Sequence, residues 1–373
     1  MIDAMGVIYA AENDAKLKEI TRNRSVAAIP VGGRYRVIDF VLSNMVNSGI
    51  RNVGIITQNH YSSLMGHLGP GKEWDLNRKR DGLFILPPYV GHDHQGWYKG
   101  SVDALHSIMG YIRRSDQKYI VLSGGHTISN MIYNDAYEFH IDKGADITLI
   151  YKNENEMPPD ELKKNILIQT MEDGRITDME IKPALPKSTK MSIGVYIIEK
   201  YLLEYLVEEC TAHGNSDFER DILLRKLDKL KIYGFPYKGY AAYIDSIQSY
   251  FHHNMDLLDP EIRNELFFKP GRIYTRVKDE VPARYSGTAV AHNCVVADGC
   301  VVEGEVENSV LFRGVKIYKG VKIRNCVIMQ NCEILDDAIL ENVILDKEVI
   351  IKRGKRLTSQ ESYPMVIGKG TVI

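Results

Sequence analysis

Residues 315–327 read VKIYKGVKIRNCV and place a valine at every sixth position. A six-residue apolar period is typical of a left-handed parallel β-helix, in which each turn has three short faces and each face turns one small or branched aliphatic residue inward. We therefore expect roughly four coils of about 18 residues each. The residues with this spacing are Val290, Val296 and Val302; Val315, Val321 and Val327; and Ile339, Leu345 and Ile351.

The cysteines follow the same spacing. Cys294 and Cys300 are six positions apart, as are Cys326 and Cys332. We expect these residues to be small core side chains rather than reactive thiols. A β-sandwich with chance spacing is the alternative, and three separate six-residue series argue against it. The fifth cysteine, Cys210, leaves an odd count without a CxxC pair, which favours reduced thiols in the cytoplasm and disfavours a zinc site.

The first two thirds of the chain alternate short apolar runs with helical patterns. This rhythm predicts an α/β domain of Rossmann-like type with a mixed, mostly parallel sheet. Asp173-Gly174 between two apolar runs predicts a hairpin that adds an antiparallel element. The expected helices are 37–48 and 103–113, and the expected strands are 7–10, 53–57, 119–122 and 146–151. We divide the chain into this domain at 1–255, a proline-marked linker at 256–281 and the β-helix at 282–373.

The composition is that of an ordinary globular protein. The chain has 373 residues, 44% of them apolar, and a formal net charge of −2. This near-neutral charge gives no reason to expect a nucleic-acid or membrane partner. No run approaches the roughly 18 apolar residues of a membrane span. A strand is predicted almost at the first residue, so we expect no signal peptide and a cytoplasmic location.

Three segments name a family. Residues 30–44 (PVGGRYRVIDFVLSN), 96–105 (GWYKGSVDAL) and 119–126 (YIVLSGGH), followed by the six-residue repeat, resemble glucose-1-phosphate adenylyltransferase, also called ADP-glucose pyrophosphorylase. The resemblance covers nearly the whole chain in the same order. It implies a nucleotidyltransferase domain joined to a left-handed β-helix. It also implies the conversion of ATP and glucose 1-phosphate to ADP-glucose and pyrophosphate with the help of Mg²⁺.

The nucleotide-binding loop departs from this family. The family reads A-G-G-x-G-x-R-L, whereas residues 10–17 read AAENDAKL. Glycines let backbone N–H groups approach phosphate closely, and here side chains replace them. Glu12 and Asp14 bring negative charge towards an anion. Lys16 stands where the family has an arginine, and it lacks the planar fork that matches a phosphate.

The metal ligands depart as well. The family holds Mg²⁺ with one aspartate in L-S-G-D-H and a second in G-Y-W-x-D-V-G-T. The matching positions here are Gly125 and Tyr243, so both carboxylates are missing. Asp245 lies two positions beyond Tyr243 and leaves open a shifted metal site. We expect no metal cofactor and no catalytic residue, because a pyrophosphorylase needs Mg²⁺ to offset the triphosphate charge.

Other positions resemble the substrate pocket of the family. Lys182 matches a lysine that contacts the sugar phosphate, although Ile181 disturbs the spacing of that motif. The remaining matches are to the adenine side and the hexose side of the pocket. The predicted pocket residues are Tyr98, Gly100, Lys182, Ser192 and Asp217. A purely structural role for these positions is the alternative.

Basic residues are candidates for regulation. In the resembling family a phosphorylated effector binds between the two domains, using cations from both. The predicted effector-binding residues are Arg34, Arg36, Arg353 and Arg356, and we expect Arg34 to converge with Arg353 and Arg356. Two cationic clusters suit a phosphate, because charged hydrogen bonds are stronger than neutral ones.

These departures predict a regulatory, catalytically deficient subunit. Its expected partner is a catalytic glucose-1-phosphate adenylyltransferase in a hetero-oligomer, with a tetramer suggested by the family and self-association left open. One alternative is an active nucleotidyltransferase with a rearranged site. The other is a stand-alone sensor of sugar phosphates or nucleotides.

Overall fold

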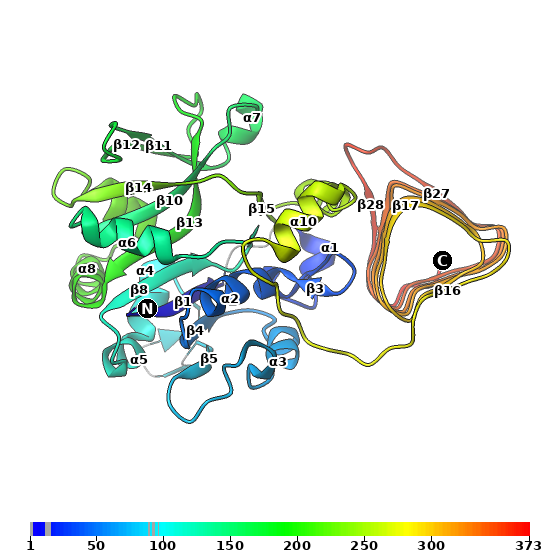
Figure 1. The fold of residues 1–373 in the computed structure, drawn as a ribbon, viewed down its shortest axis with the longest axis horizontal. Coiled ribbons are helices and arrows are strands. Elements are labelled where there is room, and N and C mark those ends of the chain that lie inside the picture. Colours follow the sequence, from blue (N-terminus) through cyan, green and yellow to red (C-terminus); the bar gives the residue numbers. More distant parts are fainter. Residues whose placement is uncertain (1–2, 12–15, 89, 92–93, 96) are drawn as a thin grey trace.

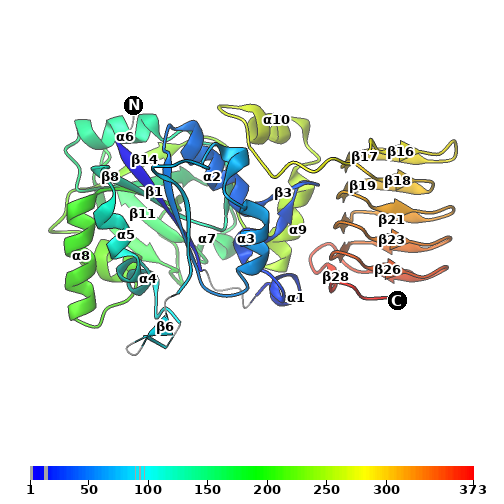
Figure 2. The same ribbon diagram turned by 90° about the horizontal axis from the view of Figure 1, so that it is seen from below.

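The computed structural model describes residues 3–11, 16–88, 90–91, 94–95 and 97–373. The chain forms an α/β domain followed by a parallel β-helix with a triangular cross-section (Figure 1). Figure 2 shows the coils of the β-helix stacked beside the α/β domain. In the described part of the chain, no helix is long and apolar enough to cross a membrane.

A mixed sheet of nine described strands forms the centre of the α/β domain. Strands β8 (Tyr119–Gly124), β1 (Ala4–Ala10), β4 (Asn52–Thr57) and β5 (Gly82–Leu86) run parallel to one another. Strand β13 (Lys190–Glu199) pairs antiparallel with β8. The remaining strands are β10 (Ile147–Asn153), β14 (Ile232–Tyr237), β11 (Ile166–Thr170) and β12 (Ile176–Ile181). The predicted hairpin is confirmed, since β11 and β12 are antiparallel and Gly174 between them has φ +90°.

Helices cover both faces of this sheet. One face packs against α2 (Val37–Asn47), α3 (Ser62–Leu68) and α6 (Asn134–Asp142). The other packs against α4 (Ser101–Ser107), α5 (Met109–Arg114) and α8 (Lys200–Ala212). The helix expected over 37–48 is confirmed. The single helix expected over 103–113 is wrong, because α4 and α5 are separate helices that meet at Ile108. At the break, the Ser107 hydroxyl donates a hydrogen bond to the Ala104 carbonyl.

Shorter elements connect the layers and form the rim of the domain. They are α1 (Lys18–Thr21), η1 (Val26–Ala28), β2 (Pro30–Val31), β3 (Tyr35–Arg36), η2 (Lys72–Trp74), β6 (Val90–Gly91), β7 (His94–Gln95), β9 (Thr127–Ser129), α7 (Pro159–Leu162), the π-helix η3 (Phe218–Leu224) and β15 (Ala241–Tyr243).

The β-helix consists of short parallel strands. One face contains β16 (Arg284–Tyr285), β18 (Val301–Val302), β20 (Lys316–Ile317), β23 (Glu333–Ile334) and β26 (Ile350–Ile351). The other two faces are formed by β17 (Val290–Val296), β19 (Glu305–Leu311), β21 (Lys322–Arg324), β22 (Val327–Ile328), β24 (Ile339–Glu341), β25 (Val343–Leu345), β27 (Arg356–Thr358) and β28 (Met365–Ile367).

The coils are shorter than expected. Val301, Lys316, Glu333 and Ile350 are stacked on one another, so successive coils advance by 15 or 17 residues rather than 18. Val290 is 56% exposed and Ile339 is only partly buried, because the register stacks both with Glu305 and Lys322 on the outward side of the coil. The other predicted inward residues are buried, except for the partly buried Val296. All five cysteines are free thiols, and Cys300, Cys326 and Cys332 are buried in the β-helix as expected, whereas Cys294 is half-buried.

Helices replace the first half of the predicted linker. Helix α9 (Ile247–Asp256) ends there, and α10 (Pro260–Phe268) follows. The Asp259 carboxylate accepts a hydrogen bond of 2.7 Å from the Glu261 amide, and Pro260 occupies the first turn. A proline at that position starts a helix rather than interrupting one, which the sequence reading missed. The two domains then pack through a shared apolar cluster that includes Phe251, Phe312 and Met329.

Candidate functional site

A cleft of about 370 Å³ opens at the carboxyl ends of β1 and β8. Ligands of open α/β sheets bind at this edge, where loops diverge from the strands. Val7 and Tyr9 of β1 and residues 122–124 of β8 form its floor. The start of α4 and the start of η3, with Asp217 just before it, form its walls. Three of the predicted pocket residues line this cleft: Gly100, Lys182 and Asp217.

One wall of the cleft, formed by Tyr196, Asp217 and Glu219, carries oxygens that form hydrogen bonds. The Asp217 carboxylate accepts a hydrogen bond of 2.7 Å from the Arg220 amide. The Tyr196 hydroxyl donates to the Glu219 carboxylate at 3.2 Å. Burial, and then the charge of Asp217, raises the pKa of Glu219. A wall of this composition suits the hydroxyl groups of a sugar, which both donate and accept hydrogen bonds.

Close backbone packing holds this wall in place. A side chain at Gly100 would collide with the Ser216 carbonyl oxygen. The same carbonyl accepts a hydrogen bond of 2.8 Å from the Val102 amide. The Ser101 hydroxyl accepts one of 2.8 Å from the Phe218 amide. Gly100 is therefore required by the close approach of two chain segments.

Two predicted pocket residues lie off the cleft wall. Tyr98 packs against the apolar core beneath α4, and burial raises the pKa of its hydroxyl. Ser192 is buried in β13, where its hydroxyl accepts a hydrogen bond of 3.2 Å from the Gly194 amide. Gly194, two residues further, lines the cleft instead.

A second hollow of about 540 Å³ adjoins the cleft. Four lysines line it, and among the described lining residues Asp245 is the one carboxylate. Lys182 and His126 line both hollows, so the two are continuous. The other lysines are Lys16, Lys163 and Lys164. Together the hollows suit a compound with a hydroxyl-bearing ring at one end and phosphate at the other.

Lys182 has an unusual backbone. Its φ of +50° lies in the left-handed region, which non-glycine residues rarely adopt. The Asn165 carbonyl accepts a hydrogen bond of 3.0 Å from the Lys182 amide and fixes this conformation. Strained residues of this kind gather at binding sites, where the surrounding structure over-determines them. The strain supports a ligand-binding role for Lys182.

The two positions that match the metal ligands of the family, Gly125 and Tyr243, lie beside the hollows and have no carboxylate. The Gly125 amide donates a hydrogen bond of 2.7 Å to the Tyr9 carbonyl. The Tyr243 hydroxyl donates one of 2.6 Å to the Ser192 carbonyl, and burial raises its pKa well above the usual value. Its ring lies 5.6 Å from the ring of His126.

Asp245, the candidate for a shifted site, is held by its neighbours. Its carboxylate accepts a hydrogen bond of 3.0 Å from the Ser246 hydroxyl, next to the start of α9. The described residues contain no group of three or more His, Cys, Asp or Glu side chains that could hold a metal. One carboxylate in a hollow lined by four lysines does not fit a Mg²⁺ ion, because the lysine charges repel the cation. Glu12 and Asp14 lie outside the described residues.

Comparisons with known proteins agree with this architecture. A family model described as nucleotidyl transferase matches residues 5–259, and one described as GlmU-like, C-terminal hexapeptide, matches residues 280–362. The chain is 36% identical to the glucose-1-phosphate adenylyltransferase of Pseudothermotoga lettingae, over 100% of this chain and 90% of that protein. The chain belongs to the glucose-1-phosphate adenylyltransferase family.

Another relative in this family has a different name. The glycogen biosynthesis protein GlgD of Bacillus subtilis (strain 168) is 37% identical over 369 residues, which cover 99% of this chain and 96% of that protein. The glucose-1-phosphate adenylyltransferase of Clostridium novyi is 36% identical over 84% of this chain and 82% of that protein. The chain is thus similar both to named adenylyltransferases and to a protein named for glycogen biosynthesis.

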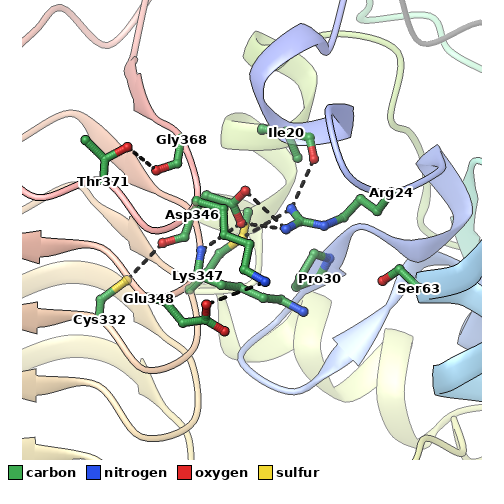
Figure 3. A network of polar contacts seen from close by, with 12 residues as sticks. Ile20, Arg24, Pro30, Ser63, Cys332, Asp346, Lys347, Glu348, Gly368 and Thr371 are labelled. Atoms are coloured by element: carbon green, nitrogen blue, oxygen red, sulfur yellow. Dashed lines mark hydrogen bonds and ion pairs between the residues drawn. The ribbon is translucent and has the colours of Figure 1, made fainter. Parts of the chain in front are cut away.

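A cluster of cations lies where the two domains of this adenylyltransferase family member meet (Figure 3). Arg24, between α1 and η1, forms an ion pair with Asp346, which follows β25. The distances are 2.8 and 3.1 Å, and the side chains are 3% and 2% exposed. Burial, together with Arg36, Arg24 and Lys278, lowers the pKa of Lys347 to about 7. Burial also lowers the pKa of Arg36 to about 10, with Arg24 and Arg276 contributing.

The structure separates the four predicted effector residues. Arg36 belongs to the interdomain cluster. Arg34 lies over the Tyr35 ring at 5.3 Å. The pKa of Arg313 is lowered mainly by burial and then by the charge of Arg34. Arg353 pairs with Asp337 at 3.1 Å in the turn between β26 and β27. That turn lies at the vertex of the β-helix away from the α/β domain (Figure 1).

The expected convergence of Arg34 with Arg353 and Arg356 is therefore wrong. The β-helix meets the α/β domain through residues of β19, β22 and β25, and Arg353 and Arg356 lie on other parts of the coil. The cations that do meet Arg36 are Arg24 and Lys347, which the sequence did not single out. Neither residue lies in a recognisable motif, and only their position between the two domains distinguishes them from surface cations.

Proposed function

We propose that this chain is a regulatory subunit of glucose-1-phosphate adenylyltransferase that performs no transfer itself. In a hetero-oligomer it would alter the rate or effector response of a catalytic paralogue that makes ADP-glucose for glycogen. The observation that carries the proposal is the pair Gly125 and Tyr243. One has no side chain, and the other turns its hydroxyl to the Ser192 carbonyl, where the family has two metal-binding aspartates.

The missing groups act on the same step. Transfer from a triphosphate requires cations that offset the charge on the transferring and leaving groups. Without the two family carboxylates, the described residues contain no group of three or more His, Cys, Asp or Glu side chains that could anchor Mg²⁺. Lys16 in place of an arginine weakens the site further, because loss of one arginine-type stabiliser costs about 10³–10⁵ in rate. We expect turnover by this chain alone to be negligible.

The hollows support retained ligand binding. Lys16, Lys163, Lys164 and Lys182 could balance a phosphate charge without a metal ion. The Asp217 and Glu219 wall could receive sugar hydroxyls. A stand-alone sugar-phosphate sensor is the second candidate function, and this lysine-lined hollow is the observation that favours it.

The interdomain cations support regulation. Arg24, Arg36 and Lys347 bring positive charge from both domains to one place, with Asp346 as counter-charge. A phosphate-bearing effector bound there would contact both domains and could shift their arrangement. A coupling of ~1–3 kcal/mol would change ligand affinity roughly 5–150-fold.

Co-expression tests the proposal. ADP-glucose synthesis is compared for this chain alone, a catalytic paralogue from the same organism alone, and the two co-expressed. We expect an inert chain that changes the rate or activator response of its partner. An inert chain that neither binds nor alters the paralogue, yet binds glucose 1-phosphate, would instead select the sensor.

A further inference from the structure

Asp346 occupies the position of an anion inside the interdomain cluster. Both of its carboxylate oxygens accept hydrogen bonds from the Arg24 guanidinium, at 2.8 and 3.1 Å. The Lys347 amide donates a third, of 2.7 Å. A guanidinium nitrogen and a backbone amide are also the donors that bind phosphate oxygens in proteins. Figure 3 shows Arg24 reaching from the α/β domain to this carboxylate.

Cations outnumber carboxylates around this pair. The charged form of the Lys347 amine is disfavoured by three described cations, Arg36, Arg24 and Lys278. It is favoured by the Asp346 carboxylate. Arg36 is partly buried; Arg24 and Arg276 disfavour its charged form, whereas Asp39 favours it. Among these described groups the two carboxylates, Asp346 and Asp39, are therefore outnumbered by the neighbouring cations. A dianion such as phosphate would compensate this excess better than the single charge of Asp346.

The pair also joins the two domains. Arg24 is anchored in the α/β domain, where it donates a hydrogen bond of 3.0 Å to the Ile20 carbonyl. Asp346 belongs to the β-helix, and its own carbonyl accepts a hydrogen bond of 3.0 Å from the Cys332 thiol. A buried ion stabilises a fold only while it keeps its partner. If another anion took Arg24, Asp346 would be left buried without its partner and would have to move.

We propose that Asp346 is an internal competitor for the phosphate of an effector. In the free protein its carboxylate holds Arg24. An incoming phosphate replaces it there, and the ion pair between the α/β domain and the β-helix breaks. The proposal rests on the effector site of the proposed function and gives that site its mechanism: binding is converted into a loosened domain junction.

Inorganic phosphate is the probe, and titration calorimetry on the full chain is the measurement. Asp346→Asn keeps the shape and the acceptor for the Lys347 amide but removes the charge. We expect it to bind phosphate about tenfold more tightly than the wild type, equivalent to ~1.4 kcal/mol. Asp337→Asn is the matched control, because Asp337 pairs with Arg353 at 3.1 Å on the distant vertex and its loss should leave the affinity unchanged. Arg24→Gln should abolish the binding, which assigns it to this cluster.

A second measurement needs no variant. Saturating phosphate should speed hydrogen exchange of the Lys347 amide in the wild type, because that amide loses its Asp346 acceptor. Equal phosphate affinities of the wild type and Asp346→Asn, or an unchanged exchange rate, would overturn the competition while leaving the effector site standing. Absence of Arg24-dependent phosphate binding in both proteins would overturn the site and the competition together.

Discussion

The Tyr243 hydroxyl donates a hydrogen bond of 2.6 Å to the main-chain carbonyl of Ser192. This bond ties β15 to β13 beside the two hollows. The phenol therefore serves as a structural tie at a position where the family has an aspartate. A carboxylate there would have no proton to donate to that carbonyl at neutral pH.

Tyr243→Phe tests this structural role. The change leaves a carbonyl without its donor in a buried site, so we expect a loss of roughly 1–3 kcal/mol in the free energy of unfolding. Denaturant unfolding measures it. Tyr201→Phe is the control, because Tyr201 is 69% exposed and removal of its hydroxyl should change the free energy of unfolding little. Equal stability of the two variants would contradict the assigned role.

Restoring the family aspartates should not restore transfer. A Cβ at Gly125 would lie 3.1 Å from the Ala10 Cα and from the Tyr9 carbonyl oxygen, which is tighter than ordinary packing. We expect Gly125→Asp to destabilise the fold by about 1–3 kcal/mol through this crowding. The double variant Gly125→Asp/Tyr243→Asp should form no ADP-glucose, because Lys16 and the loop before it are unchanged. Synthesis by the double variant would show that the metal ligands alone had been limiting.

The Arg24–Asp346 pair should dominate the polar stability of the domain junction. Arg24→Gln leaves the Asp346 carboxylate buried without its cation, so we expect a loss of about 3–5 kcal/mol in the free energy of unfolding. Arg353→Gln is the matched control in an exposed Arg–Asp pair, where a change within about 1 kcal/mol is expected. Thermal or denaturant unfolding compares them. Similar losses for the two variants would contradict a buried, unscreened pair.

Lys347 should make stability depend on pH. Its pKa in the folded protein is about 7, below the usual 10.5 of the unfolded chain. Above pH 7 the unfolded state binds more protons than the folded state, so stability increases as pH rises. We expect the Lys347→Met variant to lose this increase in stability. Denaturant unfolding between pH 6.5 and 9, a range that extends above the pKa of about 7, measures it. Lys316→Met, which removes a surface lysine paired with Glu333, should keep the wild-type slope.

Glucose 1-phosphate should bind without a metal. We expect the same affinity in magnesium and in EDTA, because lysines rather than carboxylates line the hollow. Lys182→Gln should weaken binding about tenfold through loss of a charged hydrogen bond. Lys187→Gln is the control, as Lys187 lies in the same segment but pairs with Glu180. Binding that requires magnesium would contradict this account of the hollow.

Local periodicity made much of the fold predictable. Helix α2 and the β-helix each leave a repeat of apolar residues in the sequence, because their core-facing positions recur at a fixed spacing. The hairpin at Gly174 is marked instead by a turn dipeptide between two apolar runs. The length of each coil was harder to predict from the sequence. Corners of the β-helix take residues such as Asn325 and Asn342 in a left-handed conformation, and these allow coils of 17 residues where strict six-residue turns would give 18.

The sites depended more on contacts between distant segments. Gly125 and Tyr243 could be recognised from short motifs. Arg24 and Asp346 are 322 positions apart, and no local pattern pairs them. Arg353 was chosen for its charge, but charge does not tell which face of the β-helix packs on the α/β domain. Lys163 and Lys164 lie in a helix-to-strand turn, and only the fold brings them near Lys182.

We expect this chain to lack the transfer chemistry of its family. ADP-glucose formation by the purified chain, with saturating ATP, glucose 1-phosphate and Mg²⁺, is measured beside a preparation without protein. We expect no ADP-glucose in either preparation. Magnesium-dependent synthesis that disappears in Asp245→Asn would show that the chain retains this chemistry and would identify Asp245 as the ligand of a rearranged metal site.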